Sequence, residues 1–383
     1  MDWIVAPDDA EWRLSEVLPS ALGAMGVAGF TDTVGLPECS SAAVLLVDGL
    51  GWRSLREHAA DAPLLSSLDT GRPGAAGFPT TTATSISSLG TGTCSGRHGV
   101  VGYSFAEPGG GLFRPLSWSK KDASGNGQSM LQEWPPEQAQ PNAPVLERAG
   151  ASGVDTRLVV PAEFEGTGLT RAALRGGTFR GIRAVGDLAA EMRESLGRKS
   201  PVLCYGYHGQ LDMLGHVHGP GSLPWRMQLR QVDTLVRSIV EGLPGGTALL
   251  VVADHGMVRA DPELSTDIDA DPDLLEGVRL VGGEARARHL YTEPGAAEDV
   301  LAAWRERLGP DALVVSAAEA VEAGWFGSTL SDAARERMGD VIALARRNGI
   351  IRSIAEPKES ALRGQHGSLT AEEQYIPMLL AQG

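Results

Sequence analysis

The sequence predicts an α/β protein, a three-layer α/β/α sandwich with a mostly parallel central sheet and small cap insertions. Short apolar runs, each leading into an acid or polar residues, occur at 42–48, 201–206 and 247–254, as expected for buried parallel strands. Segments with helical spacing of apolar residues lie between such runs. Alternating strands and helices form a sheet that is covered by helices on both faces.

The clearest helix is expected at 222–243, with Ser222 as its N-cap. Apolar side chains recur there at intervals of three and four residues, which places them on one face. These residues are Trp225, Leu229, Val232, Leu235, Ile239 and Leu243.

The 383 residues are enough for one large catalytic domain, and we expect residues 1–383 to form it. Two segments differ from the strand and helix pattern. Residues 103–145 are rich in Gly, Pro, Asn and Gln but also carry five aromatic residues. A structureless loop of that length is improbable in a compact domain, so we expect a cap or insertion there. The acidic residues 260–285 are expected to form a second, short insertion.

The formal net charge of -15 and the lack of any basic block argue against a nucleic-acid polymer as partner. A small phosphorylated substrate stays compatible, because bound metals can supply local positive charge. No apolar stretch approaches the ~20 residues that span a bilayer, so no membrane partner is expected. Three scattered cysteines (Cys39, Cys94 and Cys204) favour the reducing cytoplasm.

Asp and His residues gather near the predicted strand ends in four separate segments. These are Asp48-Gly49, Asp212 to His216, Asp254 to Met257 and Gly364 to Gly367, and they supply three carboxylates and three imidazoles. Mixed oxygen and nitrogen ligands suit Zn²⁺ or Mn²⁺ better than Mg²⁺ or Ca²⁺. Each segment alone is a weak signal, but their joint occurrence at strand ends predicts a metal site.

Residues 78–92, FPTTTATSISSLGTG, predict a strand end followed by a helix of small residues. Thr80, Thr81 and Thr82 lie where that helix begins, near free backbone N–H groups that also favour a phosphate. A threonine hydroxyl is a poor nucleophile unless a metal or base activates it. The segment alone could be an N-cap and a packed helix, and the metal segments elsewhere favour a catalytic hydroxyl.

The order of these segments resembles the nucleotide pyrophosphatase/phosphodiesterase branch of the alkaline-phosphatase superfamily, from about residue 42 to the C-terminus. Its most specific elements are Asp212 to Pro220 and Asp254 to Met257. The resemblance implies an alkaline-phosphatase-like fold, with Thr82 as the nucleophile. It also implies two divalent ions, Zn²⁺ with Mn²⁺ as the alternative. One ion would be held by Asp212, His216 and His366, and the other by Asp48, Asp254 and His255.

The resemblance also suggests substrate contacts, although two departures limit them. Tyr207 matches a tyrosine that stacks on the nucleobase, whereas Tyr103 falls where the family has a phosphate-binding asparagine. The family often has Phe-Pro-Asn after the nucleophile, and this chain has Ala83-Thr84-Ser85 instead. One aromatic wall of a base pocket is therefore missing.

Two further segments look closest to soluble bacterial cyclic di-AMP phosphodiesterases, namely 283–292 and 356–374. That closer likeness makes Arg286, Arg288 and Lys358 candidate contacts for a second phosphate, with solvated basic residues as an equal alternative. His289 could face substrate, and a structural histidine is an equal alternative there too.

The expected function is metal-dependent hydrolysis of nucleotide phosphodiester bonds through a phosphothreonine intermediate, with cyclic di-AMP as a candidate substrate. The expected partner is therefore a small nucleotide. A phosphonoacetate-type C–P hydrolase uses a threonine and the same metals, and it remains open. A catalytically silent metal- or nucleotide-binding protein also remains open.

Overall fold

The computed structural model describes residues 3–121, 127–198 and 201–383. Its central sheet has six strands in the order β20-β10-β1-β9-β7-β8, and only β20 runs antiparallel to its neighbour. This confirms the predicted, mostly parallel sheet. The strands are β1 (Ser41–Val47), β7 (Asp155–Pro161), β8 (Thr178–Ile182), β9 (Val202–His208), β10 (Thr247–Val252) and β20 (Leu379–Gln382).

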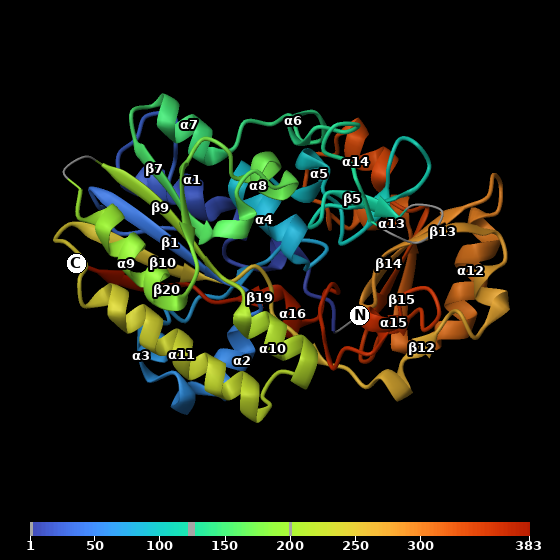
Figure 1. Ribbon diagram of the computed structural model, residues 1–383. Helices are drawn as coiled ribbons and strands as arrows, with labels where there is room; N and C mark the ends of the chain where they lie inside the picture. The colour runs from blue at the N-terminus through green and yellow to red at the C-terminus, as the bar shows by residue number, and fades with distance from the viewer. Residues whose placement is uncertain (1–2, 122–126, 199–200) are drawn as a thin grey trace.

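Helices cover both faces of this sheet, which makes the three predicted layers (Figure 1). One face carries α1 (Val17–Ala24), α4 (Thr82–Thr91), α7 (Val145–Ala151) and α8 (Gly168–Ala173). The other carries α3 (Pro63–Leu68), α9 (Val185–Leu196) and α11 (Leu223–Val240). Helix α11 is the one predicted at 222–243, and its five predicted apolar residues up to Ile239 are all buried.

The register of the central strands brings three chain segments together at one edge. Val47, the last residue of β1, pairs with His208 at the end of β9, and Leu46 pairs with Val252 at the end of β10. Both β1 and β10 are buried along their whole length, which is why their sequences are continuously apolar. The residues that follow these strands therefore emerge side by side, where ligands bind in such sheets.

Helix α4 is buried over all ten of its residues, and this explains its run of Thr, Ser, Ala and Gly. Large side chains would not fit, because the helix packs against α1, α5 (Ser95–His98), α7 and α8. The segment before the helix is a turn rather than the predicted strand end, since the nearest strand is β2 (Gly74–Ala75).

The described residues of 103–145, where we expected a cap or insertion, form a small antiparallel sheet whose aromatic side chains join the main hydrophobic core. Its strands are β3 (Phe105–Ala106), β4 (Leu112–Arg114), β5 (Ser119–Lys121) and β6 (Gly127–Ser129), and α6 (Pro136–Ala139) follows. The rings of Phe105, Phe113, Trp118 and Trp134 pack edge to face or tilted at 4.9 to 5.5 Å between centroids.

A third sheet has the order β13-β14-β16-β15 and is antiparallel throughout. Its strands are β13 (Val278–Glu284), β14 (Ala287–Thr292), β15 (Ala312–Ser316) and β16 (Val341–Ala345). With α12 (Ala297–Leu308) it encloses a separate hydrophobic core around Trp304 and lies beside the main sheet (Figure 1). The expected short insertion at 260–285 therefore runs directly into a longer unit, because β13 lies within it and pairs with β14, which follows it in the chain.

Several short elements connect these three sheets. The helices among them are α2 (Trp52–Glu57), α13 (Ala317–Glu322), α14 (Asp332–Arg337), α15 (Pro357–Ser360) and α16 (Ala371–Gln374). The strands are β11 (Val258–Arg259), β12 (Thr266–Asp267), β17 (Ile350–Ile351), β18 (Gly364–Gln365) and β19 (Tyr375–Ile376). Within the described residues, no helix combines the length and apolar character needed to cross a bilayer.

Candidate active site

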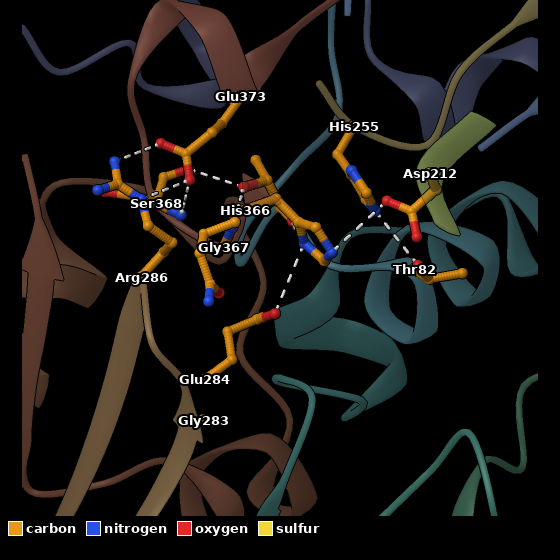
Figure 2. A network of polar contacts seen from close by, with 12 residues as sticks. Thr82, Asp212, His255, Gly283, Glu284, Arg286, His366, Gly367, Ser368 and Glu373 are labelled. Atoms are coloured by element: carbon orange, nitrogen blue, oxygen red, sulfur yellow. Dashed lines mark hydrogen bonds and ion pairs between the residues drawn. The ribbon is translucent and has the colours of Figure 1, made fainter. Parts of the chain in front are cut away.

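The strand-end residues predicted as metal ligands converge in the structure. Two groups form in which the ligand atoms all lie within 4.8 Å of one another. One group is Asp212, His216 and His366, and the other is Asp48, Asp212 and His255. Asp212 belongs to both groups, because it lies between them on α10 (Gln210–His218). Figure 2 shows Asp212, His255 and His366 pointing toward one another.

All three histidines in these groups present the same nitrogen to the site. The Nδ1 atoms of His216, His366 and His255 lie 2.8, 2.9 and 3.0 Å from backbone carbonyl oxygens. A carbonyl oxygen only accepts, so each Nδ1 carries a proton and each Nε2 offers a lone pair. The Nε2 atoms of His216 and His366 face each other at 3.1 Å. Two lone pairs directed at one point are the arrangement that a shared cation requires.

The carboxylates of the site have too few partners in the protein. Asp48 Oδ1, Asp212 Oδ1 and Asp254 Oδ2 are buried without a hydrogen-bond partner among the described residues. Burial raises the pKa of Asp48 well above its ordinary value, and the nearby Asp254 and Asp212 carboxylates raise it further. Burial likewise raises the pKa of Asp212. Divalent cations would offset this uncompensated charge, so the residues fit the expected metals.

Asp254 has a different arrangement from the other predicted ligands. Its Oδ1 accepts the backbone N–H groups of Gly49 and His255 at 3.1 and 3.0 Å. Its Oδ2 lies 3.4 Å from His255 Nε2, so one oxygen still faces the group of Asp48, Asp212 and His255.

Gly49 has φ +73°, and a Cβ there would lie 3.0 Å from Asp212 Cα. Only glycine allows the loop after β1 to approach Asp212 this closely.

Thr82, the predicted nucleophile, is the first residue of α4 and is buried beside both groups. Its Oγ1 lies 3.2 Å from His255 Nε2. The preceding turn is tied to the loop that carries His366. Thr80 Oγ1 donates to the Ser368 carbonyl at 2.8 Å and accepts the Gly367 N–H at 3.0 Å. The Thr80 side chain therefore ties the predicted nucleophile and one predicted metal ligand together.

Two hollows flank Thr82, and Leu116 of the 103–145 sheet lines both. The first, which we call the apolar hollow, is lined by Ile86, Phe164, Leu174, Tyr205 and Tyr207. The second, the acidic hollow, is lined by Tyr103, Glu284, Glu356 and Glu359. Tyr207 and Tyr103, both predicted substrate contacts, thus lie on opposite sides of the predicted nucleophile.

Tyr207 also contacts a predicted metal ligand directly. Its hydroxyl donates to Asp48 Oδ2, and burial together with the Asp48 charge raises the pKa of Tyr207 well above its ordinary value. Its ring packs at 5.8 Å from Phe164, which belongs to the same hollow. The ring can therefore still form a wall for a base while its hydroxyl orients Asp48.

The structure does not place Arg286, Arg288 or His289 where a substrate phosphate would contact them. Arg286 is fully buried against Glu373, and Arg288 is buried against Glu356 at 2.8 Å. His289 is buried, and its Nδ1 accepts the Gly339 N–H. Arg288 and His289 lie on β14, which is buried from Ala287 to Tyr291, and Arg286 lies in the turn before it. This arrangement argues against the expected contacts with a second phosphate.

Lys358, the remaining predicted contact, is exposed on α15. It does not line the acidic hollow, although its neighbour Glu359 does. The structure thus brings together the predicted nucleophile, the six predicted metal ligands, Tyr207 and Tyr103, but not the predicted basic residues.

Glu284 is the residue that the sequence analysis missed. It is the last residue of β13, and its Oε2 lies 3.5 Å from His366 Nδ1 (Figure 2). Burial raises the pKa of Glu284 well above its ordinary value. The signal was present in the sequence, because an apolar run, VRLVGGE, ends in an acid there just as the runs before Asp48 and Asp254 do.

The fold matches that of solved structures. Murine ectonucleotide pyrophosphatase/phosphodiesterase 5, solved as an inactive variant in complex with AMP, superposes with a TM-score of 0.66 at 17% identity, covering 88% of this chain and 87% of that one. The human protein of the same name superposes with a TM-score of 0.65 at 16% identity, with the same coverage of both chains. A search of curated proteins finds no match.

A family model described as "Type I phosphodiesterase / nucleotide pyrophosphatase" matches residues 42–369. The matched range contains Thr82, both metal-ligand groups and both hollows. Because it covers most of the 383 residues, it establishes the family that the resemblance implied. This chain is therefore a hydrolase that belongs to the type I phosphodiesterase/nucleotide pyrophosphatase family.

Proposed function

We propose that this protein is a metal-dependent phosphodiesterase that cleaves nucleotide phosphodiester bonds through a phosphothreonine intermediate. The observation that carries the proposal is the position of Thr82. Thr82 is the first residue of the buried helix α4, and its hydroxyl contacts His255. The residue lies between the apolar hollow and the acidic hollow. A diester has two substituents on phosphorus, and a nucleophile between two hollows has room for both.

In the proposed reaction, the hydroxyl proton of Thr82 passes to solvent and Oγ1 attacks phosphorus in line. A bond forms between Oγ1 and phosphorus, and the opposite P–O bond breaks. The departing alcohol oxygen takes a proton from solvent. Water then cleaves the phosphothreonine, which releases the nucleoside monophosphate and restores the hydroxyl. Backbone N–H groups at the start of α4 face the charge that builds on the phosphoryl oxygens.

Two divalent ions, Zn²⁺ with Mn²⁺ as the alternative, would supply positive charge that activates the hydroxyl and offsets charge on the phosphoryl group. Asp212, His216 and His366 would hold one ion. Asp48, His255 and Asp254 would hold the other, with Asp212 close to both. The mixture of imidazole and carboxylate ligands supports this choice of metals.

A nucleoside is the proposed substituent in the apolar hollow. Its walls combine Tyr207 and Phe164 with aliphatic side chains, which suit the face of a base. The complex of the murine relative with AMP supports a nucleotide ligand. Cyclic di-AMP has less support, because the two arginines expected to contact its second phosphate are buried in ion pairs.

The test is turnover by metal-loaded protein of four compounds, namely bis-p-nitrophenyl phosphate, p-nitrophenyl phosphate, cyclic di-AMP and phosphonoacetate. Diester cleavage with weak monoester cleavage would support the proposal. Phosphate release from phosphonoacetate alone would favour C–P hydrolysis instead. Bound metal with no turnover of any compound would favour a silent binding protein.

A further inference from the structure

A further cavity shares Tyr207 with the apolar hollow and lies outside the predicted metal site. Side chains alternate along a strand, so Tyr207 and His208 at the end of β9 point to opposite faces of the central sheet. His208 lies on the face covered by α9 and α11, since Leu188 of α9 and Gln228 of α11 line the cavity with it. The cavity has a volume of about 330 Å³, which is within the range of small-molecule sites. We call it the glutamine pocket.

His208 supplies a hydrogen-bond donor at the wall of this pocket. Its side chain is 5% exposed, and its Nε2 lies 3.1 Å from Gln228 Nε2. An amide nitrogen only donates, so His208 Nε2 accepts and Nδ1 carries the proton of the neutral ring. Burial lowers the pKa of His208 to about 4, which keeps the ring neutral at neutral pH.

The Nδ1–H group of His208 is open to the glutamine pocket. The contact with Gln228 is the polar contact of the ring, and Nδ1 has no hydrogen-bond partner among the residues that the structure describes. Nδ1 is also not one of the fully buried polar atoms that lack a partner. It therefore keeps accessible surface, and the cavity that His208 lines is the space it reaches. Water or an acceptor on a ligand would satisfy this donor.

The other walls of the pocket combine apolar surface with neutral amides. The amide groups belong to Gln228 and to the exposed Gln210 and Gln231, which offer both donors and acceptors. The apolar side chains are those of Pro161, Ile182, Val185 and Leu188.

The charged side chains of the pocket have opposite signs. Glu163 and Arg183 both line it, and both are exposed. Their charges offset each other and are screened by solvent, so the lining gives no net charge that would favour an anion or a cation. A neutral ligand with apolar faces and a hydrogen-bonding edge matches such a lining.

We propose that the glutamine pocket binds a nucleobase, as a second base site beside the apolar hollow. The faces of a base are flat and apolar, and its edge carries both donors and acceptors. Adenine suits glutamine amides in particular, because one amide can bond its N6 and N7 atoms together. The inference goes beyond the proposed function, since it concerns a nucleoside that is bound without being cleaved.

The test is calorimetric titration of the metal-loaded full chain with adenosine, which carries no phosphate to cleave. Leu116→Trp first obstructs the apolar hollow at an exposed position, so that binding in the glutamine pocket is measured alone. We expect this variant to bind adenosine. Adding His208→Leu should then weaken binding by at least about tenfold, and adding the exposed Gln231→Ala instead should weaken it by about threefold.

Arg183→Gln is the matched control, because it removes a charge from the same pocket and leaves the amides and His208 in place. It should change adenosine binding less than about twofold, since the ligand is neutral. A loss of about tenfold in Arg183→Gln would indicate an anion site and overturn the inference. Adenosine binding that Leu116→Trp abolishes, or that neither His208→Leu nor Gln231→Ala weakens, would also overturn it. Adenosine binding in the pocket without diester turnover would support this inference and overturn the proposed function.

Discussion

Arg286 donates two hydrogen bonds to Glu373, at 3.1 and 2.8 Å, and neither side chain is exposed to solvent. Glu373 also accepts the N–H of Ser368 (Figure 2) and the hydroxyl of Thr370. These two residues belong to the loop that carries His366. The ion pair therefore connects the turn between β13 and β14 to the loop of a predicted metal ligand.

Replacement of Arg286 by Met should lower the free energy of unfolding by about 3–5 kcal/mol, because it leaves the Glu373 charge buried and unpaired. Denaturant unfolding measures this loss. The double variant with Glu373→Gln should recover part of it, since no buried charge then remains. If the free energy of unfolding of Arg286→Met lies within about 0.5 kcal/mol of the wild-type value, the ion pair does not stabilise the loop.

The role of Arg286 could not be predicted from the sequence. Its partner is 87 residues away, and Glu373 lies in a short helix that no pattern relates to β13. A basic residue near a predicted phosphate site suggests a ligand contact, whereas a buried arginine is revealed only by the packing around it. Arg288 likewise suggested a phosphate contact, but it forms an ion pair with Glu356, which lies in another segment of the chain.

Metal content should separate the two predicted ligand groups. His216 belongs to one group only, so His216→Ala should lower the metal content from two ions per chain to one. Asp212 is shared, so Asp212→Ala should lower the content of both sites. Elemental analysis of dialysed protein measures the number of metal ions per chain. Equal losses in the two variants would contradict the shared position of Asp212.

Tyr207 should affect metal binding and substrate binding through different atoms. Tyr207→Phe removes the hydroxyl that donates to Asp48 but keeps the ring. Such outer contacts typically change metal affinity by about 10- to 100-fold. We expect a higher metal concentration for half-activation, with KM for a nucleotide diester nearly unchanged. Tyr207→Leu should raise KM as well, and an equal effect of both variants on KM would contradict a stacking role.

Stability should depend on pH through His98, which lies on α5 away from the predicted metals. Burial, together with the smaller effect of the Arg337 charge, lowers the pKa of His98 to about 3. Its Nδ1 accepts the Val100 N–H at 3.1 Å, and its Nε2 lies 3.0 Å from Ser88 Oγ. The folded protein thus holds a neutral imidazole, whereas the unfolded chain binds a proton below about pH 6.5.

The unfolded state therefore gains protons first as the pH falls, and the stability that His98 contributes declines from about pH 6.5 downward. Between pH 7 and pH 5 this loss should reach about 2 kcal/mol. His98→Asn cannot titrate, so its free energy of unfolding should fall less over the same interval. Urea unfolding at both pH values measures the difference, and identical declines in the two proteins would contradict it.

Most of the predicted active site follows from the sequence because parallel strands end at one edge. Asp48 and Asp254 each follow an apolar run, and the register of β1 with β10 brings them together. Glu284 follows the same rule from a different sheet, but nothing in the sequence shows that this sheet lies beside Thr82. The two hollows likewise depend on Leu116 and on the packing of the 103–145 sheet.

The most direct test of the central claim is diester turnover by Thr82→Ala, measured together with its metal content. Thr82 Oγ1 is the proposed attacking atom, whereas the predicted metal ligands are other residues. We therefore expect metal content equal to that of the wild type and a loss of at least about a thousandfold in kcat. Turnover near the wild-type rate with full metal content would contradict Thr82 as the nucleophile.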